Sequence, residues 1–362
     1  MLFGSRIVPD DHRAFAALPV TRYTVGPANE QIAVHVSGRL AIGRVPLICV
    51  PGFQRNMADF SEFANQFRRG FGDDWPVVLL DLKGRGRSSD RADKTRYIST
   101  IDATDLVQIV AALALDGGIF VGQGYGGQVI MALAADRPNL VAGAVLLDSG
   151  PVSDPRGLVR LRNNLRDIEG HRSEAGFRAM FRRMLAADYP GLPEGVLDVL
   201  VGRTHYLDKR DRVRALFDPH LVKMLDSFEH DDILVPQWPL YEALANTPLL
   251  LMRTQLTDQL RRETFEEMLR RRRDVEGYVI EGQGSPALLH TPEDVEPIAE
   301  FVRKIVKRRS KAPPDQLSTA TFRGPNKASS FACSRQCSRP IRPTMPRCVS
   351  TQPICAAPSP AT

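Results

Sequence analysis

Three glycine-containing segments follow short hydrophobic runs in the first half of the chain. They are residues 50–56 (VPGFQRN), 81–90 (DLKGRGRSSD) and 121–127 (VGQGYGG). Glycine lets the backbone turn sharply and lets other groups approach it closely. A sharp strand-to-helix turn lifts its central residue above the sheet, where a nucleophilic side chain would be exposed. In the third segment that residue is Gly124, which has no side chain to attack a substrate.

The elements around these segments predict an α/β protein. Short hydrophobic runs alternate with amphipathic helical patterns, which is typical of a mostly parallel, doubly wound sheet covered by helices. Buried strands are predicted at 46–50, 76–80, 118–121, 144–147, 248–252 and 278–281, and helices at 57–68, 101–114, 128–135, 262–272 and 292–308. Residues 34–37 and 41–44 predict an antiparallel hairpin ahead of the parallel strands.

A long helical stretch interrupts this alternation. Residues 151–245 hold helical patterns at 160–167, 176–185, 193–201 and 211–217 and no convincing strand. They predict a helical cap inserted between two core strands. After about residue 310 the periodicity stops, and Pro, Ser, Thr, Arg and Cys dominate, which favours disorder or a segment read in a shifted frame. We therefore expect a core of residues 1–150 and 246–309, a cap of 151–245 and a disordered tail of 310–362.

The order and spacing of the three glycine-containing segments resemble the α/β-hydrolase superfamily. The corresponding segments of that superfamily read HG-F, D-x-R-G-x-G-x-S and G-x-S-x-G-G. The resemblance covers roughly residues 30–305, and residues 237–252 (QWPLYEALANTPLLLM) are similar to bacterial esterase-like members with a helical cap. It implies the α/β-hydrolase fold and, in an active member, a Ser nucleophile, a His base and an acid.

The resemblance assigns a role to individual positions. Gly124 matches the nucleophile, Asp258 the acid, and Ser285 the His, counted back from the helix start at 292–293. The backbone N–H groups of Phe53 and Tyr125 match the oxyanion hole, which needs no particular side chain. Serine cannot serve as a general base near neutral pH. Two of the three catalytic side chains are therefore replaced in this sequence.

Other residues offer limited substitutes. His290 could act as the base, but its place just before a helix start favours a surface or capping role. Gln123 and Tyr125 flank the nucleophile position and project in other directions. Asp258 has an alternative role as a helix cap or a solvated loop acid.

Composition limits the partners of the chain. Of the 362 residues 43% are hydrophobic and 25% charged, without an apolar run of about 18 residues. From residue 307 onward ten basic residues face one acid, so the net charge of +6 leaves about −3 for the preceding part. We expect no nucleic-acid or membrane partner and, without a secretory signal at the N-terminus, a cytoplasmic location.

The cysteines favour neither a metal nor a redox role. Cys49 lies in a hydrophobic run, as a buried, reduced thiol would. The other four, all in the predicted tail, match no zinc pattern; they are Cys333, Cys337, Cys348 and Cys355. We expect no metal and no cofactor.

Three hypotheses follow from these residues. The first is a relative without standard Ser-His-Asp hydrolysis, a pseudoenzyme that binds a small molecule under the cap. The second is an active hydrolase or lyase with a non-standard site, acting on an ester or related carbonyl substrate. The third is a sequence that is decaying without function.

Overall fold

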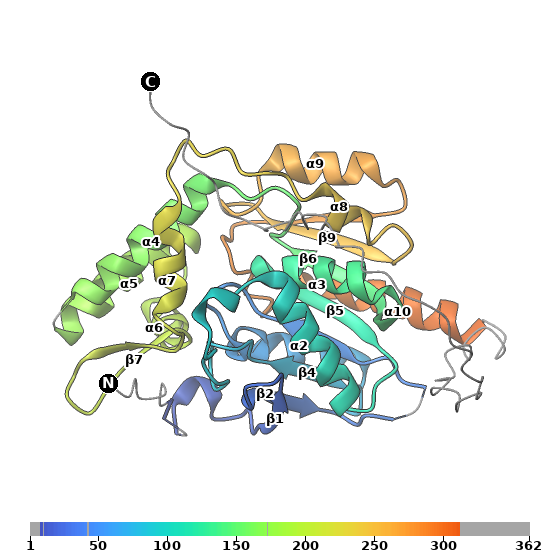
Figure 1. The fold of residues 1–362 in the computed structure, drawn as a ribbon, viewed down its shortest axis with the longest axis horizontal. Coiled ribbons are helices and arrows are strands. Elements are labelled where there is room, and N and C mark those ends of the chain that lie inside the picture. Colours follow the sequence, from blue (N-terminus) through green and yellow to red (C-terminus); the bar gives the residue numbers. More distant parts are fainter. Residues whose placement is uncertain (1–7, 10, 42, 172, 312–362) are drawn as a thin grey trace, which may run out of the picture.

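The computed structural model describes residues 8–311 except 10, 42 and 172. Residues 312–362, most of the predicted tail with its four cysteines, lie outside the described residues. An eight-stranded sheet forms the centre of the described part (Figure 1). Its order is β1-β2-β4-β3-β5-β6-β9-β10, and it is parallel from β4 to β10. The strands are β1 Thr21–Val25, β2 Glu30–Ser37, β3 Leu47–Val50, β4 Val77–Leu80, β5 Gly118–Gln123, β6 Val141–Leu147, β9 Leu249–Thr254 and β10 Glu276–Ile280.

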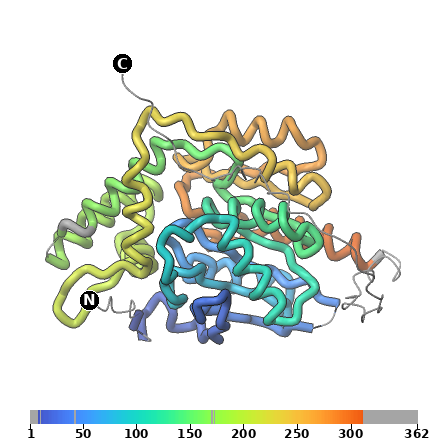
Figure 2. Tube along the Cα trace, in the orientation of Figure 1, coloured from blue at the N-terminus to red at the C-terminus, as the bar shows by residue number. Residues whose placement is uncertain are grey.

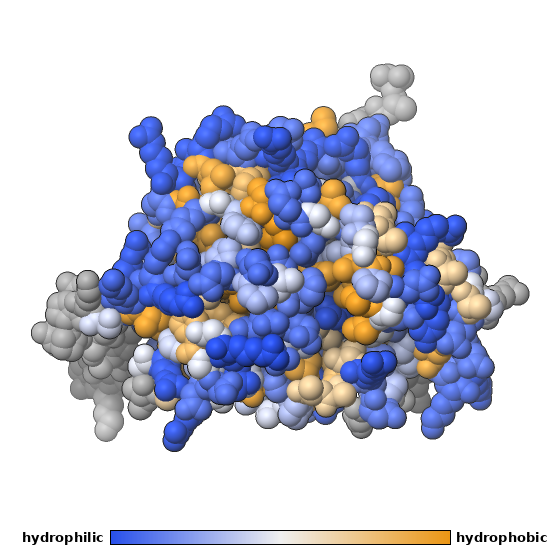
Figure 3. Space-filling view, turned by 180° about the vertical axis from the view of Figure 1, so that it is seen from behind, coloured by the Kyte–Doolittle hydropathy of each residue, from blue (hydrophilic) through white to orange (hydrophobic). Residues whose placement is uncertain are grey.

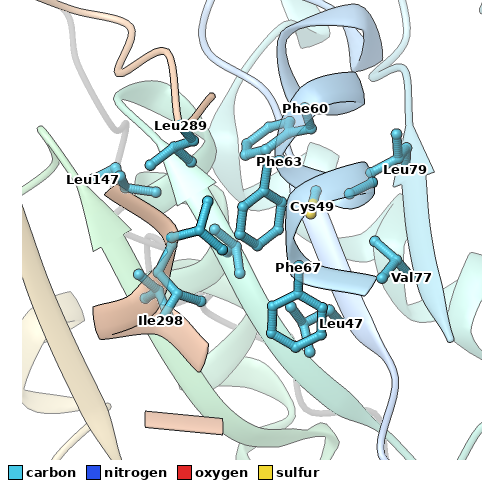
Figure 4. Packing of buried hydrophobic residues seen from close by; sticks show 14 of the residues in the cluster. Leu47, Cys49, Phe60, Phe63, Phe67, Val77, Leu79, Leu147, Leu289 and Ile298 are labelled. Atoms are coloured by element: carbon cyan, nitrogen blue, oxygen red, sulfur yellow. The ribbon is translucent and has the colours of Figure 1, made fainter. Parts of the chain in front are cut away.

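Helices cover both faces of this sheet, as the predicted α/β architecture requires. Helices α1 (Ser61–Phe71) and α10 (Pro292–Lys311) cover one face, where Phe63 and Phe67 lie beside Leu47 and Cys49, and Ile298 lies on the Leu147 side of the same cluster (Figure 4). The helices that cover the other face are α2 Ser99–Ala112, α3 Tyr125–Asp136, α8 Trp238–Glu242 and α9 Arg262–Arg271. Short 3₁₀ helices lie at Arg13–Phe15, Met57–Phe60, Lys94–Arg96, Pro138–Leu140 and Leu225–Ser227.

The N-terminal hairpin pairs β2 with the strand before it in the chain, where the sequence predicted a partner after it. Strand β2 pairs with Thr21–Val25 and not with residues 41–44, and the register runs from Thr21 opposite Val34 to Val25 opposite Glu30. The prediction of a strand at 41–44 was wrong, since the described residues there, Ala41, Gly43 and Arg44, lie in no strand. Residues 21–25 (TRYTV) carry β-branched and aromatic side chains, which favour a strand. Gly43 has a φ of +85°, a conformation typical of a turn.

Residues 151–245, called the insert below, leave the sheet between β6 and β9. Besides α8, which covers the sheet, its helices are α4 Pro155–Gly170, α5 Glu174–Asp188, α6 Glu194–Gly202 and α7 His220–Met224. They gather at one side of the sheet, and the tube trace shows this green-to-yellow stretch as a separate lobe (Figures 1 and 2). Phe177, Leu200 and Leu221 form its buried cluster, which also includes Tyr97 and Leu288 of the core.

One element of the insert was predicted as the wrong type. Residues 205–217 contain a hairpin of β7 (His205–Leu207) and β8 (Val213–Ala215), where a helix was expected at 211–217 and no strand anywhere in the insert. The Asp208 carboxylate accepts hydrogen bonds from the Arg210 and Arg212 amides, at 2.9 and 3.1 Å, and thereby closes the turn. Such an Asp side chain competes with helical hydrogen bonding and favours a turn.

The surface carries no large hydrophobic region on the face seen from behind (Figure 3). Hydrophilic side chains dominate this face, and hydrophobic ones gather in small patches between them. Among the helices of the described part of the chain, none is both long enough and apolar enough to cross a membrane.

Candidate functional site

The turn between β5 and α3 places Gly124 at the carboxyl edge of the sheet. Gly124 has φ +49° and ψ −114°, a strained conformation for a residue with a Cβ. Its N–H donates to the Leu147 carbonyl at 2.8 Å, and its own carbonyl accepts from the Gly127 N–H at 3.0 Å. The sharp turn predicted at residues 121–127 is therefore present, fixed by main-chain hydrogen bonds.

The start of α3 lies directly against the loop that follows β3. A Cβ on Gly126 would lie 2.1 Å from the Val50 carbonyl oxygen, so only glycine permits this approach. It brings Phe53 and Tyr125 together, with their ring centroids 5.5 Å apart. Within the described part of the chain, the N–H groups of these two residues donate to no protein acceptor. Two free amide donors are thus held beside Gly124.

A buried cation supports this pair of loops. The Arg85 Nε donates to the Phe53 carbonyl at 2.7 Å. Its guanidinium lies 5.6, 5.4 and 5.2 Å from the ring centroids of Phe53, Tyr97 and Tyr125. The Tyr125 hydroxyl donates to Asp102 at 2.8 Å, and burial raises the pKa of that hydroxyl well above its usual value. The side chains of Phe53 and Tyr125 are thus anchored below the amides.

A second buried group, Asp148, lies at the carboxyl end of β6. Its carboxylate accepts from the Thr254 N–H and from the Thr254 hydroxyl, both at 2.7 Å. The Ser285 hydroxyl also hydrogen-bonds to it and, like Thr254, lowers its pKa. Burial outweighs these hydrogen bonds and raises the Asp148 pKa to about 6. Asp148 also has a φ of +47°, so its backbone is strained.

Asp258 lies elsewhere at this edge, in the loop between β9 and α9. Its carboxylate pairs with Arg160 of α4 at 2.6 Å and is 32% exposed. The next residue, Gln259, faces the turn: its Oε1 lies 2.5 Å from where a Cβ on Gly124 would stand. The structure therefore brings Ser285 to Asp148, and Asp258 to Arg160.

Sequence reasoning did not assign Asp148 and Gln259 to the site. An acid immediately after a buried strand at the carboxyl edge was an available signal for Asp148. No signal identified Gln259, because its position over Gly124 depends on the path of the loop.

The histidines take other positions. The His290 Nδ1 lies 3.9 Å from the Asp294 carboxylate at the start of α10, and its side chain is 39% exposed. His205 is buried among Phe177, Phe181 and Phe217, and burial lowers its pKa to about 3. A neutral, enclosed imidazole of this kind packs the insert. Within the described residues, no three His, Cys, Asp or Glu side chains are grouped so that they could hold a metal ion.

The fold and the turn between β5 and α3 define an α/β hydrolase, and comparison with known proteins agrees. The model of the alpha/beta hydrolase family matches residues 47–302, and the chain belongs to this family. It is similar to the 3-hydroxybutyrate-oligomer hydrolase of Cupriavidus necator, with 28% identity over 284 residues, which cover 75% of this chain and 92% of that protein.

Solved structures show the same fold. An alpha/beta hydrolase from Novosphingobium aromaticivorans matches 79% of this chain and 98% of its own, with a TM-score of 0.69 and 26% identity. A thermophilic esterase from Thermogutta terrifontis, solved with malate bound, matches 79% of this chain and 99% of its own, with a TM-score of 0.59 and 20% identity. At that identity the second likeness concerns the fold alone.

Proposed function

We propose that this chain binds a small molecule with a carbonyl or carboxylate oxygen at the amides of Phe53 and Tyr125, with the insert as a cap. It does so without nucleophilic hydrolysis. The observation that supports this most directly is Gly124, which occupies the sharp turn beside two free amides and carries no side chain. Preorganised amides stabilise a substrate oxygen whether or not a nucleophile is present.

The base position supports the same proposal. Ser285 hydrogen-bonds to the buried Asp148, where a catalytic His would use an acid to orient its ring. A serine hydroxyl cannot accept a proton from an attacking group near neutral pH. Both the nucleophile and its base are therefore missing from the arrangement that hydrolysis requires.

A second candidate function is an active hydrolase or lyase with a non-standard site. One observation favours it: the Asp148 pKa of about 6 suits a general base at physiological pH. Asp148 would then remove a proton from water or from a substrate carbon. The relative from Cupriavidus necator bears the name of a hydrolase, which supports an ester as the substrate class.

Turnover of a short-chain aryl ester separates the two candidates. We expect the unmodified protein to match buffer alone. The variant Gly124→Ser with Ser285→His should hydrolyse p-nitrophenyl acetate at least about a hundredfold faster, because a nucleophile and a general base are restored. The added Cβ meets only the movable end of the Gln259 side chain.

The control variant is Gly124→Ala with Ser285→His, which has the same Cβ and imidazole but no hydroxyl. It should stay at the rate of buffer. The unmodified protein could instead turn over the ester, with Asp148→Asn abolishing this activity. That result would contradict the non-catalytic proposal and support the second candidate. A Gly124→Ser, Ser285→His variant without turnover would show that more of the site than these two residues has changed.

A further inference from the structure

An open cleft with a cavity volume of about 560 Å³ lies where the N-terminal ends of α4 and α9 meet the end of β9. Figure 1 shows the ends of α4 and α9 next to each other at the side of the sheet that the insert covers. Three acids line the cleft, and five arginines face them: Arg156, Arg160, Arg253, Arg261 and Arg262. We call it the arginine cleft.

Two of the arginines are already matched with carboxylates. Arg160 lies between Asp258 at 2.6 Å and Asp188 at 3.6 Å. Arg262 pairs with Glu266 at 2.8 Å, one turn along α9. These two side chains therefore have little charge to offer a ligand.

Two further arginines of the cleft, Arg156 and Arg261, have one carboxylate between them at ion-pair distance. Arg156 and Arg261 share the single carboxylate of Asp154, at 3.0 and 2.6 Å. Hydrogen bonds from Arg261, chiefly, lower the Asp154 pKa, so this carboxylate stays charged and neutralises only one of the two. Glu263, which also lines the cleft and interacts with Arg261, supplies a second negative charge, so these two arginines face two carboxylates.

Arg253 differs from the other arginines of the cleft because backbone carbonyl groups hold its guanidinium, although its charge also acts on Asp148. It donates to the backbone carbonyls of Leu260 and Gln255, at 2.9 and 3.2 Å, and no described carboxylate lies within ion-pair distance of it. Leu260 directly precedes Arg261, so both arginines stand at the start of α9. That helix also begins without a side-chain cap, so its first N–H groups add partial positive charge there.

The arginine cleft adjoins the Gly124 site through one loop. Asp258 lines the cleft, and the next residue, Gln259, lies over Gly124. On the other side, the Asp188 carbonyl accepts from the Gly284 N–H at 2.5 Å, and Ser285 follows. The loop at residues 258–259 therefore borders both the arginine cleft and the Gly124 site.

We infer that Arg253 and Arg261 bind a carboxylate of the ligand whose carbonyl oxygen lies at the two amides. The ligand class is a small acid with a second carbonyl group, such as the monoester of a dicarboxylic acid. This subsite rests on the proposed function, because it assigns the other end of the same ligand. Guanidinium groups suit this role, since their paired N–H groups match a carboxylate.

Calorimetric titration of the full chain tests the inference with monomethyl succinate, which has one carboxylate, and dimethyl succinate, which has none. We expect the monoester to bind at least about tenfold more tightly, because charged hydrogen bonds add to the binding energy. Its affinity should fall as potassium chloride is added, since salt screens exposed charges. Equal affinities for the two esters would overturn the carboxylate subsite and leave the proposed function standing.

In the variant Arg253→Gln with Arg261→Gln, the affinity for the monoester should fall about tenfold. The affinity for the diester should stay unchanged. Arg253→Lys should keep part of the preference because the charge remains. The matched control is Arg178→Gln with Arg182→Gln, two arginines of α5 that pair with Glu174 and Asp198. It should bind both esters as the unmodified protein does. A folded Arg253→Gln, Arg261→Gln variant with unchanged monoester affinity overturns the inference.

Acetate, which has a carboxylate and no second carbonyl, distinguishes the two proposals. If acetate binds as tightly as the monoester, and the Arg253→Gln, Arg261→Gln variant does not bind it, the carboxylate subsite is supported. The same result would contradict the carbonyl site at the two amides. Binding of none of the three molecules would overturn both proposals.

Discussion

The two sides of the Gly124 site differ in how they are built. On the side of Phe53 and Tyr125, a buried arginine, two aromatic rings in edge-to-face contact and main-chain contacts hold two amides in place. On the side of Asp148, a strained buried carboxylate meets a serine hydroxyl, and a glutamine lies over a glycine. The first side depends on backbone and packing, and the second on the identity of a few side chains. The comparison teaches that one side can be tested through its stability and the other through the chemistry of single side chains.

The largest effect is expected on the supported side, from Arg85→Met. The change removes the hydrogen bond to the Phe53 carbonyl and a cation 3.5 Å from the buried Asp102. Asp102 keeps its ion pair with Arg91 at 2.5 Å, but the buried carbonyl groups of Phe53 and Lys83 lose a charged donor, which costs about 3–5 kcal/mol in total. Urea unfolding should show a loss of that size, whereas Arg69→Met, on the exposed face of α1, should stay within about 0.5 kcal/mol. If Arg85→Met lowers the free energy of unfolding by less than about 1 kcal/mol, packing around Arg85 does not hold the first side in place.

The next effect concerns Asp148 and pH. Its folded pKa of about 6 lies above the value of about 3.9 in unfolded chains, so the folded state holds the proton more tightly. The protonated Asp148 therefore stabilises the fold fully below about pH 4, and this contribution to the free energy of unfolding is lost as the pH rises through 6. Asp148→Asn has no such group, so its stability relative to the unmodified protein should rise over this window by up to about 3 kcal/mol. Unfolding by urea at a series of pH values measures the difference.

Thr254→Val serves as the matched control for this titration. The Thr254 hydroxyl donates to the carboxylate and favours its charged form, so its removal should move the window to higher pH. A constant difference between Asp148→Asn and the unmodified protein from pH 4 to 8 would contradict the raised pKa.

The smallest effect is expected at Gly124 itself. Gly124→Ala places a Cβ on a backbone with positive φ and should cost about 1–2 kcal/mol. Gly195→Ala in α6, where a Cβ meets open space, should be neutral or stabilise by up to about 1 kcal/mol. Adding Gln259→Ala to Gly124→Ala should recover part of the loss, because it removes the close contact. Thermal unfolding of the four proteins checks this, and equal effects at the two glycines would show that the turn is not strained.

The sequence predicted most of the sheet because buried parallel strands and their helices have distinct hydrophobic periods. The runs at 46–50, 76–80 and 118–121 each lie within one residue of a strand start, and the predicted turn at Gly124 joins β5 to α3. The sequence failed at the β7–β8 hairpin and at the first strand of the N-terminal hairpin. In both places short polar strands gave a weak periodic signal, and a pairing partner decided the structure.

The sequence by itself determined the family and the glycine at the turn, since these depend on residue type and order along the chain. Only the tertiary structure decided which acid meets Ser285. Asp148 and its partner Thr254 are 106 residues apart, and the parallel pairing of β6 with β9 brings them together. Tertiary structure also placed Gln259 over Gly124 and gathered Arg253 and Arg261 in one cleft. Burial, loop path and the approach of distant charges fix such contacts, and none of these can be read from spacing alone.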